Sequence, residues 1–129
     1  MIFSALETSG SGLVAYRKWL DAVSDNISNA DDATNPANAA YQARSVVVQA
    51  APGDAGVEVV GAAYGSATGN LVYRPGDPQA DAKGMVRVPD VDMGDQMSQL
   101  IEAQRGYQAN IAVVERAKDL YTAALQIGR

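Results

Sequence analysis

The sequence predicts an α+β protein in which two long helices, one at each end of the chain, flank a small β-rich insert. Apolar and small residues recur at heptad spacing near both ends, whereas all five prolines and most of the twelve glycines lie between these regions. Heptad spacing is typical of helices that pair as a coiled coil, and Pro and Gly punctuate turns between strands. We therefore expect the two terminal helices to pair as a coiled coil.

The N-terminal helix is predicted over residues 1–30, where the spacing alternates between four and three residues. The residues of this seam are Ile2, Leu6, Ser9, Leu13, Tyr16, Leu20, Val23, Ile27 and Ala30. The Ser-Gly-Ser-Gly run at residues 9–12 weakens the helix, because each glycine costs about 1 kcal/mol relative to alanine. We expect fraying or a bend there.

The C-terminal helix is predicted over residues 93–129, which contain no proline. Its seam is predicted at Met93, Met97, Leu100, Gln104, Tyr107, Ile111, Val114, Lys118, Tyr121 and Leu125. A second apolar row is formed by Ala117, Leu120, Ala124 and Ile127. One row can pack against the N-terminal helix, and the other then needs a different neighbour.

The middle of the chain divides into a linker at residues 31–40 and a β-rich insert at residues 41–92. Strands are predicted at Arg44–Ala51, Val57–Ala63, Leu71–Tyr73 and Met85–Val88. The Pro-Gly-Asp-Ala-Gly sequence at 52–56 predicts a turn that joins the first two strands as a hairpin. A sheet of so few short strands is marginally stable without a neighbour.

Composition excludes several kinds of chemistry. The chain has no Cys and no His, which excludes disulfides, thiol nucleophiles, Cys/His zinc sites and Ser-His-Asp triads. Its net charge of −5 disfavours coating of nucleic acid or anionic lipid. We expect no cofactor, no metal, no transmembrane segment and no cleaved signal peptide.

Two motifs that could suggest a ligand are weak. Gly10–Ala15 matches a dinucleotide-binding pattern, but no strand precedes it and the helical seam runs through it. Loop carboxylates are the remaining route to acid–base chemistry or a hard metal, at Asp31, Asp32, Asp77, Asp81, Asp90 and Asp92. They lack the spacing of an EF-hand, so we expect Asp77 and Asp81 to cap turns or face solvent.

Polar residues near the seams have two interpretations each. Asn26 and Asn29 can cap the end of the first helix, since Asn tolerates the left-handed conformation, or can hydrogen bond to a neighbouring helix. Gln104 and Lys118 can fix the register of the helices, as buried polar residues do in coiled coils, or can extend to water.

Several stretches resemble bacterial flagellar rod and hook proteins. The N-terminal signature is Leu-Glu-Thr-Ser-Gly-Ser-Gly-Leu-Val-Ala at 6–15 with Leu-Asp-Ala-Val-Ser-Asp-Asn-Ile-Ser-Asn-Ala at 20–30. The Pro-Gly-Asp-Pro loop at 75–78, the Arg-Gly-Tyr-Gln-Ala-Asn run at 105–110 and the Ile-Gly-Arg end at 127–129 resemble a proximal rod member. Asp25, Ala40 and residues 31–36 depart from the usual family pattern.

This resemblance implies a non-enzymatic subunit of the basal body in the bacterial cell envelope. It implies export through the flagellar type III channel without a cleaved signal peptide. The implied partners are other flagellar rod proteins, further copies of the chain, the export apparatus and the membrane-ring base, in a helical stack that transmits torque. No nucleic acid or membrane insertion is implied.

The helical pattern points to assembly independently, because a 30-residue helix is about 45 Å long and cannot bury itself in so small a protein. We expect assembly contacts at Leu6, Leu13, Leu20, Val23, Asn26, Ile27, Leu100, Tyr107, Asn110, Ile111, Val114, Tyr121 and Leu125. Two alternatives stay open: a coiled-coil adaptor that binds a partner through its β insert without polymerising, and a small enzyme or binding domain that uses loop carboxylates.

Overall fold

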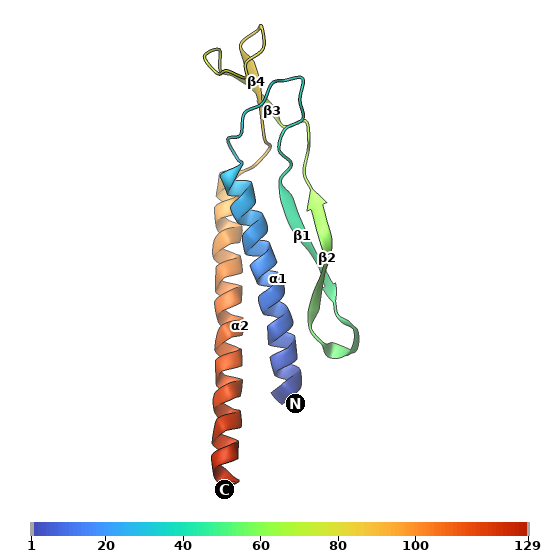
Figure 1. Cartoon of the computed structure of the whole chain (residues 1–129), viewed down its shortest axis with the longest axis vertical. Helices are drawn as coiled ribbons and strands as arrows, with labels where there is room; N and C mark the ends of the chain where they lie inside the picture. Colours follow the sequence, from blue (N-terminus) through green and yellow to red (C-terminus); the bar gives the residue numbers. More distant parts are fainter. Residues whose placement is uncertain (1, 129) are drawn as a thin grey trace. The chain divides into compact units, whose positions relative to one another are not determined.

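The computed structural model describes residues 2–128, apart from the side chains of Ile2 and Asp54. Its elements are α1 (Ile2–Ser28), β1 (Arg44–Ala50), a short 3-10 turn (Pro52–Asp54), β2 (Val57–Tyr64), β3 (Asn70–Tyr73), β4 (Met85–Val88) and α2 (Met93–Ile127) (Figure 1). The α+β class is confirmed, and each predicted strand is present. Neither helix, over the described residues, has an apolar stretch sufficient to cross a membrane.

The chain divides into two compact units, which are described separately. Unit 1 contains Met1–Leu20, Val46–Gly61 and Ile101–Arg129. Unit 2 contains Asp21–Ser45 and Ala62–Leu100. Both helices and the first two strands therefore contribute residues to each unit.

In unit 1, α1 and α2 run antiparallel and touch at small residues. A Cβ atom added at Gly12 would lie 3.0 Å from Asn110 Oδ1, and one added at Gly106 would lie 2.3 Å from the Tyr16 ring. Near the start of α1, the rings of Phe3 and Tyr121 meet edge to face with centroids 6.5 Å apart. Glycine therefore permits the helix contacts at Gly12 and Gly106.

Helix α1 continues without interruption through Ser9–Gly12, so the expected bend is absent. The packing supplies a reason, because Ser9 and Gly12 are buried and Gly12 accommodates Asn110. Tertiary contact here outweighs the low helix propensity of glycine. The predicted seam position Ile2 has a side chain outside the described set.

The packed face of α2 differs in part from the predicted seam. The residues of α2 that are buried or partly buried are Gln96, Gln99, Leu100, Ala103, Gly106, Tyr107, Asn110, Ile111, Val114 and Ala117. Of the predicted seam, Leu100, Tyr107, Ile111 and Val114 are partly buried, whereas Met93, Met97, Gln104, Lys118, Tyr121 and Leu125 are exposed. The prediction favoured large apolar side chains, whereas Ala and Gly are the residues that allow two helix backbones to approach closely.

The second predicted row on α2 does not share one environment. Ala117 is buried, while Leu120 and Ile127 are exposed. Gln104 and Lys118 are also exposed, which favours the solvent-facing interpretation of these two residues within the chain. Exposed apolar side chains therefore occur near both ends of α2, at Met93, Met97 and Ile101 and again at Leu120, Leu125 and Ile127.

Strands β1 and β2 pair as the predicted hairpin. In unit 1, the turn is closed by Ala51 N donating to Gly56 O at 2.9 Å. Gly56 has a φ of +95°, and a Cβ there would lie 2.2 Å from Ser11 Oγ. Val57 N donates to the same Ser11 Oγ at 3.0 Å. The turn is thus seated directly on α1.

In unit 2, β3 and β4 pair antiparallel, with Asn70 opposite Val88 and Tyr73 opposite Met85. The segment expected to be a linker is anchored to this pair, because Thr34 exchanges two 2.8 Å backbone hydrogen bonds with Arg87. The Arg87 guanidinium also donates to Pro36 O, at 3.2 Å from Nε and 2.8 Å from Nη2, and to Thr68 O. Residues 34–36 are therefore held against β4.

The loop between β3 and β4 confirms the turn-capping role of its carboxylates. Asp77 Oδ1 accepts from Gln79 N at 2.9 Å. Asp81 Oδ1 accepts from Lys83 N at 2.8 Å and from Met85 N at 2.9 Å. Both side chains replace backbone acceptors in tight turns.

Candidate assembly surfaces and the polar network at Asn26

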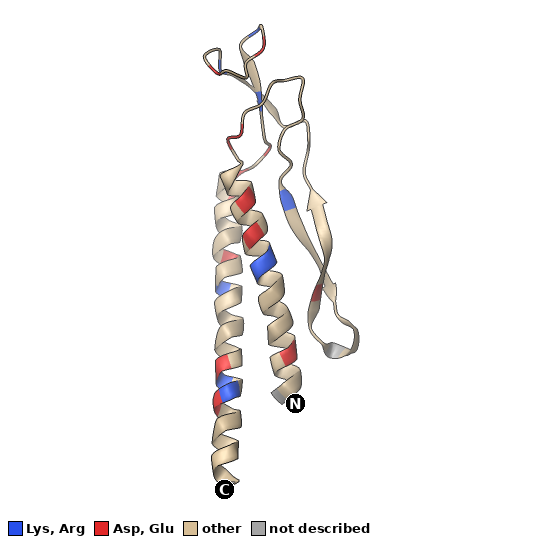
Figure 2. Cartoon of the chain, viewed as in Figure 1, with Lys and Arg blue, Asp and Glu red and all other residues tan. Residues whose placement is uncertain are grey.

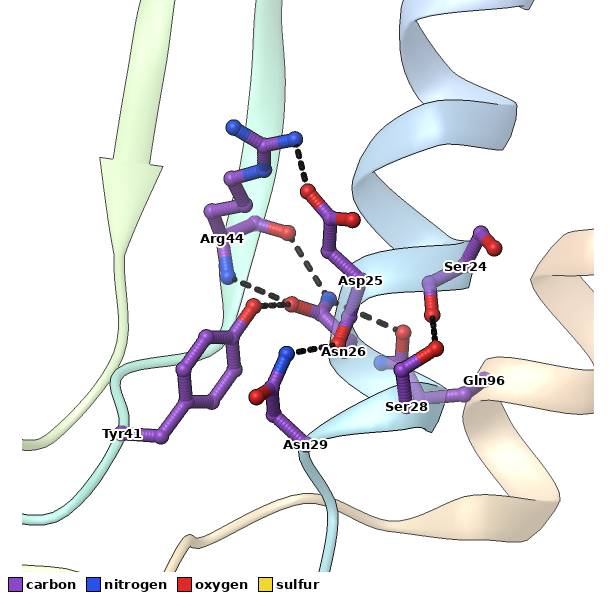
Figure 3. A network of polar contacts seen from close by, with 8 residues as sticks. All are labelled: Ser24, Asp25, Asn26, Ser28, Asn29, Tyr41, Arg44 and Gln96. Carbon is purple, nitrogen blue, oxygen red and sulfur yellow. Dashed lines mark hydrogen bonds and ion pairs between the residues drawn. The ribbon is translucent and has the colours of Figure 1, made fainter. Parts of the chain in front are cut away.

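The most completely bonded polar side chain of unit 2 is that of Asn26, near the end of α1 (Figure 3). It is 2% exposed. Its Nδ2 donates to Arg44 O at 2.9 Å and to Gln96 Oε1 at 3.0 Å. Its Oδ1 accepts from Arg44 N at 2.9 Å and from the Tyr41 hydroxyl at 3.0 Å. All four hydrogen-bonding positions of the amide are therefore used.

This arrangement joins three segments that are distant in the sequence. Asn26 comes from α1, Gln96 from α2 and Arg44 from the start of β1. The amide contacts both backbone groups of Arg44 in the way that a residue of an adjacent strand would. The predicted bonding of Asn26 to a neighbouring helix is confirmed by Gln96 of α2, and the amide additionally holds Arg44 at the start of β1.

Side chains around Asn26 hydrogen bond to backbone carbonyl groups in the last turn of α1. Asn29 Nδ2 donates to Asp25 O at 2.8 Å, which confirms its role at the helix end, and Ser28 Oγ donates to Ser24 O at 2.8 Å. The Asp25 carboxylate forms an ion pair with Arg44. Asp25 thus links the helix end to the side chain of Arg44, whose backbone Asn26 holds.

Tyr41 has an altered acidity in this network. Burial, followed by the nearby Asp25 carboxylate, raises the pKa of Tyr41 above its ordinary value of 10.0, while the Arg44 guanidinium opposes the change. The neutral hydroxyl is the form that donates to Asn26 Oδ1. The network therefore requires protonated Tyr41.

A shallow depression of about 250 Å³ lies beside the network in unit 2. It is lined by Asn26, Ala43, Arg44, Ser45, Ala63, Tyr64, Gly65, Gln96 and Gln99. The Asn26 amide and the Gln96 side-chain oxygen are bonded within the fold, and one Arg44 Nη pairs with Asp25, whereas Arg44 Nε is buried without a hydrogen-bond partner in the described part of the chain. Among the described residues, no group of three potential Asp, Glu, His or Cys ligands could hold a metal ion.

The weak dinucleotide pattern lies entirely inside a helix. Gly10–Ala15 forms part of α1, so its backbone amides belong to helical turns. Phosphate recognition by such a pattern uses a glycine turn between a strand and a helix N-terminus. Residues 10–15 therefore do not form such a phosphate-binding turn.

The predicted assembly residues occupy different environments. Val23 and Asn26 are buried inside the chain, and Tyr121 and Leu125 are exposed. The others are partly buried, at Leu6, Leu13, Leu20, Ile27, Leu100, Tyr107, Asn110, Ile111 and Val114. Val23 and Asn26 can thus serve assembly only through packing within the chain, whereas Tyr121 and Leu125 are available to neighbours.

Comparison with known proteins gives a match along the whole chain. Flagellar basal-body rod protein FlgC of Salmonella typhimurium is 39% identical over 132 aligned residues, which cover 99% of this chain and 98% of the relative. This chain belongs to the FlgC family. FlgC of Bacillus subtilis is 32% identical over 147 aligned residues, which cover 98% of each protein. FlgC of Agrobacterium fabrum is 34% identical, with coverage of 96% of this chain and 93% of the relative.

A family model described as the C-terminal part of flagellar basal body rod FlgEFG proteins matches residues 82–127. These residues include β4 and all of α2. The resemblance predicted from the sequence is confirmed. The sequence did not predict Gln96, Tyr41 and Arg44 as partners of Asn26. The one signal was for Gln96, which lies two heptads before Asn110 and therefore on a similar face of α2.

Proposed function

We propose that this FlgC-family chain is a non-enzymatic structural subunit of the rod in the flagellar basal body. It assembles with further copies of itself and with other flagellar rod proteins into a helical stack that transmits torque. The observation that carries the proposal is the end-to-end match to FlgC relatives, named as basal-body rod proteins. The proximal part of the rod is the proposed position.

The exposed apolar surface supports an assembled state. Leu120 is 66% exposed and Ile127 is 87% exposed, at the end of a helix that an isolated chain would leave in water. Such surface is unfavourable for a solitary domain and is covered when subunits associate. In the assembly, α1 and α2 pair as a coiled coil, and Tyr121 and Leu125 contact neighbouring subunits.

The hydrogen bonds of the Asn26 amide suit a subunit that carries mechanical load. The Asn26 amide joins α1, α2 and β1, so displacement of one element strains hydrogen bonds to the other two. Buried and fully bonded polar groups favour a single arrangement of the elements that they join.

In the proposed function, the chain reaches the rod through the flagellar export channel without a cleaved signal peptide. The export apparatus and the membrane-ring base are its first partners.

Gene replacement tests this function. Cells that lack the chain should lose swimming and complete rods, and the wild-type chain should restore both. Purified basal bodies should then contain the chain. A chain that restores swimming as a soluble complex, absent from purified basal bodies, would instead indicate the adaptor that binds through its β insert.

A substitution on the helix seam sharpens the test. Leu20→Asp places a charge on a partly buried position of α1 and should reduce swimming to the level of the deletion. Lys18→Asp, at an exposed position two residues earlier, is the matched control and should retain swimming. Normal swimming with Leu20→Asp would contradict the role proposed for the seam.

A further inference from the structure

Strand β3 has one edge that no described strand covers. In its antiparallel ladder with β4, Tyr73 lies opposite Met85. Arg74 N donates to Gly84 O at 2.9 Å, so the next pair along the ladder is hydrogen-bonded. Hydrogen-bonded and non-hydrogen-bonded pairs alternate, and the backbone groups of a non-hydrogen-bonded pair point away from the partner strand. Leu71 and Tyr73 therefore direct their N–H and C=O groups away from β4.

The other edge of the β3–β4 pair is occupied, and its bonding supports this orientation. Arg87 lies opposite Leu71, and it exchanges two 2.8 Å backbone hydrogen bonds with Thr34. Arg87 thus directs its backbone groups away from β3, as expected of a non-hydrogen-bonded pair. Thr34 covers the outer side of β4, whereas no described contact uses the backbone groups of Leu71 or Tyr73 on the outer side of β3.

The free edge of β3 carries exposed apolar side chains. Leu71 is 54% exposed and Tyr73 is 67% exposed, and their two-residue spacing puts them on one face of the strand. Edges that avoid pairing usually carry charges or Pro, whereas residues 70–73 contain neither. Although β3 is short, its two outward-facing residues supply two donors and two acceptors. The edge can thus accept a short extended segment as an added strand.

Strand β2 has an open edge at Gly61. Val57 N donates to Ser11 Oγ at 3.0 Å, so the backbone of Val57 faces away from β1. Backbone direction repeats every two residues along a strand, so Gly61 faces outward as Val57 does. A Cβ atom at Gly61 would meet no described atom within 4 Å. Glycine weakens a strand interior and often marks a place where another backbone approaches closely.

The two edges are complementary in charge and in size. Residues 59–64 contain no charged side chain, so this part of β2 is tan in Figure 2, and residues 70–73 are equally uncharged. Pairing of the two strands therefore places no like charges opposite each other. β3 presents a large aromatic ring at Tyr73, and β2 presents bare backbone at Gly61. An aromatic side chain opposite a glycine covers that backbone and helps to fix the register of a strand pair.

We propose that β3 of one copy of this chain pairs antiparallel with β2 of a second copy, with Tyr73 opposite Gly61. The proposal rests on the proposed function and identifies a strand contact of the assembly. Antiparallel pairing sets the outward-facing residues of the two strands directly opposite each other, so that both can donate and accept. It joins the two-stranded β3–β4 sheet of one copy to the two-stranded β1–β2 sheet of the next.

A second copy is the proposed occupant because both complementary edges belong to the same chain. Each copy can accept one neighbour on β3 and offer β2 to the next. Such a heterologous contact extends as an open stack, which suits a subunit of a rod. Pairing of β3 with β3 of another copy would instead be two-fold symmetric and would end at a dimer.

Photo-crosslinking identifies the occupant. Tyr73 is replaced by the photoreactive aromatic residue p-benzoylphenylalanine in the full chain, in cells that lack the wild-type gene. Irradiated basal bodies should give an adduct of two copies, linked between position 73 and residues 57–64. The same replacement at exposed Gln79, in the loop between β3 and β4, is the matched control and should give at least tenfold less.

The outcomes of this experiment separate the inference from the proposed function. A chain that is present in basal bodies but gives no two-copy adduct from position 73, or gives an adduct only with a different protein, would overturn the assignment to a second copy. Absence of the chain from basal bodies would count against the proposed function, and the inference would fall with it.

Proline variants test the backbone hydrogen bonds. Gly61→Pro removes an N–H that no described contact uses, so its unfolding temperature should fall less than that of Val60→Pro, whose N–H faces β1. In a chain that also carries p-benzoylphenylalanine at position 73, Gly61→Pro should lower the yield of the two-copy adduct at least tenfold. An unchanged yield would overturn the strand pairing. Equal losses of stability in the two proline variants would show that Gly61 does not face outward and would overturn the proposed edge.

Discussion

The side-chain amide of Asn26 hydrogen bonds to both backbone groups of Arg44, each at 2.9 Å. A helix residue thereby occupies the place that a neighbouring strand would take beside β1. The remaining donor and acceptor of the amide bind Gln96 and Tyr41. The start of β1 at Arg44 is thus bonded to the end of α1 through one buried side chain.

Replacement of Asn26 by the isosteric Asp should destabilise the chain by about 1–3 kcal/mol, because Arg44 O loses its donor inside the fold. Urea denaturation followed by circular dichroism measures the change. Asn29→Ala is the matched control, since Asn29 bonds only to the last turn of its own helix among the contacts described, and its midpoint should shift little. Equal midpoints for Asn26→Asp and wild type would contradict the central role of the amide.

Alkaline pH should weaken the same network. The folded-state pKa of Tyr41 is raised above its ordinary value of 10.0, so its contribution to stability is complete below that value. The contribution should disappear as the pH rises through the folded-state pKa, because phenolate cannot donate to Asn26. Urea midpoints between pH 8 and about 11.5 measure this loss. The urea midpoint of Tyr41→Phe should decline less over that range. An equal decline of the midpoint in wild type and Tyr41→Phe would show that ionisation of Tyr41 does not affect stability.

Gly106→Ala should destabilise the contact between α1 and α2 by about 1–3 kcal/mol through overpacking. The added Cβ would lie 2.3 Å from the Tyr16 ring, whose movement is restricted by stacking on Trp19 at 6.0 Å. Gly10→Ala adds the same methyl group where nothing lies within 4 Å and should raise stability by up to about 1 kcal/mol. The unfolding temperatures of the two variants should therefore shift in opposite directions relative to wild type. Shifts in the same direction would contradict the close packing of Gly106 against Tyr16 and the open space at Gly10.

Gly56→Ala should release the hairpin turn from α1. Its φ of +95° disfavours any side chain, and the new Cβ would lie 2.2 Å from Ser11 Oγ. Gly53→Ala is a matched control, because Gly53 also has a positive φ, of +70°, but has nothing within 4 Å. Hydrogen exchange at the Val57 amide, which donates to Ser11, should accelerate at least tenfold more for Gly56→Ala than for Gly53→Ala. Equal rates would show that backbone strain alone governs the turn.

Arg87→Lys should loosen residues 34–36 although the charge is kept. The planar guanidinium donates to both Pro36 O and Thr68 O, and a lysine ammonium on a flexible stem cannot reproduce that geometry. Limited proteolysis should then cut residues 31–40 faster than in wild type. Arg74→Lys is the control, because Arg74 forms an exposed ion pair with Asp31 and its loss should change cleavage little. Unchanged cleavage with Arg87→Lys would show that the hydrogen bonds of Arg87 to Pro36 O and Thr68 O do not hold residues 34–36 in place.

Local sequence patterns determined the kind of element formed by each segment. Heptad spacing predicted both long helices, and β-branched runs separated by Pro and Gly predicted the four strands and the hairpin. These features depend on neighbours within a few residues, so they can be read from the sequence without tertiary structure. The family motifs likewise predicted a flagellar rod protein, because they are short stretches of sequence that do not depend on tertiary contacts.

The tertiary structure alone decided which positions of α2 are packed and what binds Asn26. A heptad pattern defines a stripe on each helix but does not choose between large residues such as Met97 and small ones such as Ala103. That choice depends on how closely the backbones approach, which Gly12 and Gly106 control from opposite helices. The partners of Asn26 lie 15, 18 and 70 residues away, so only the folded chain brings them together.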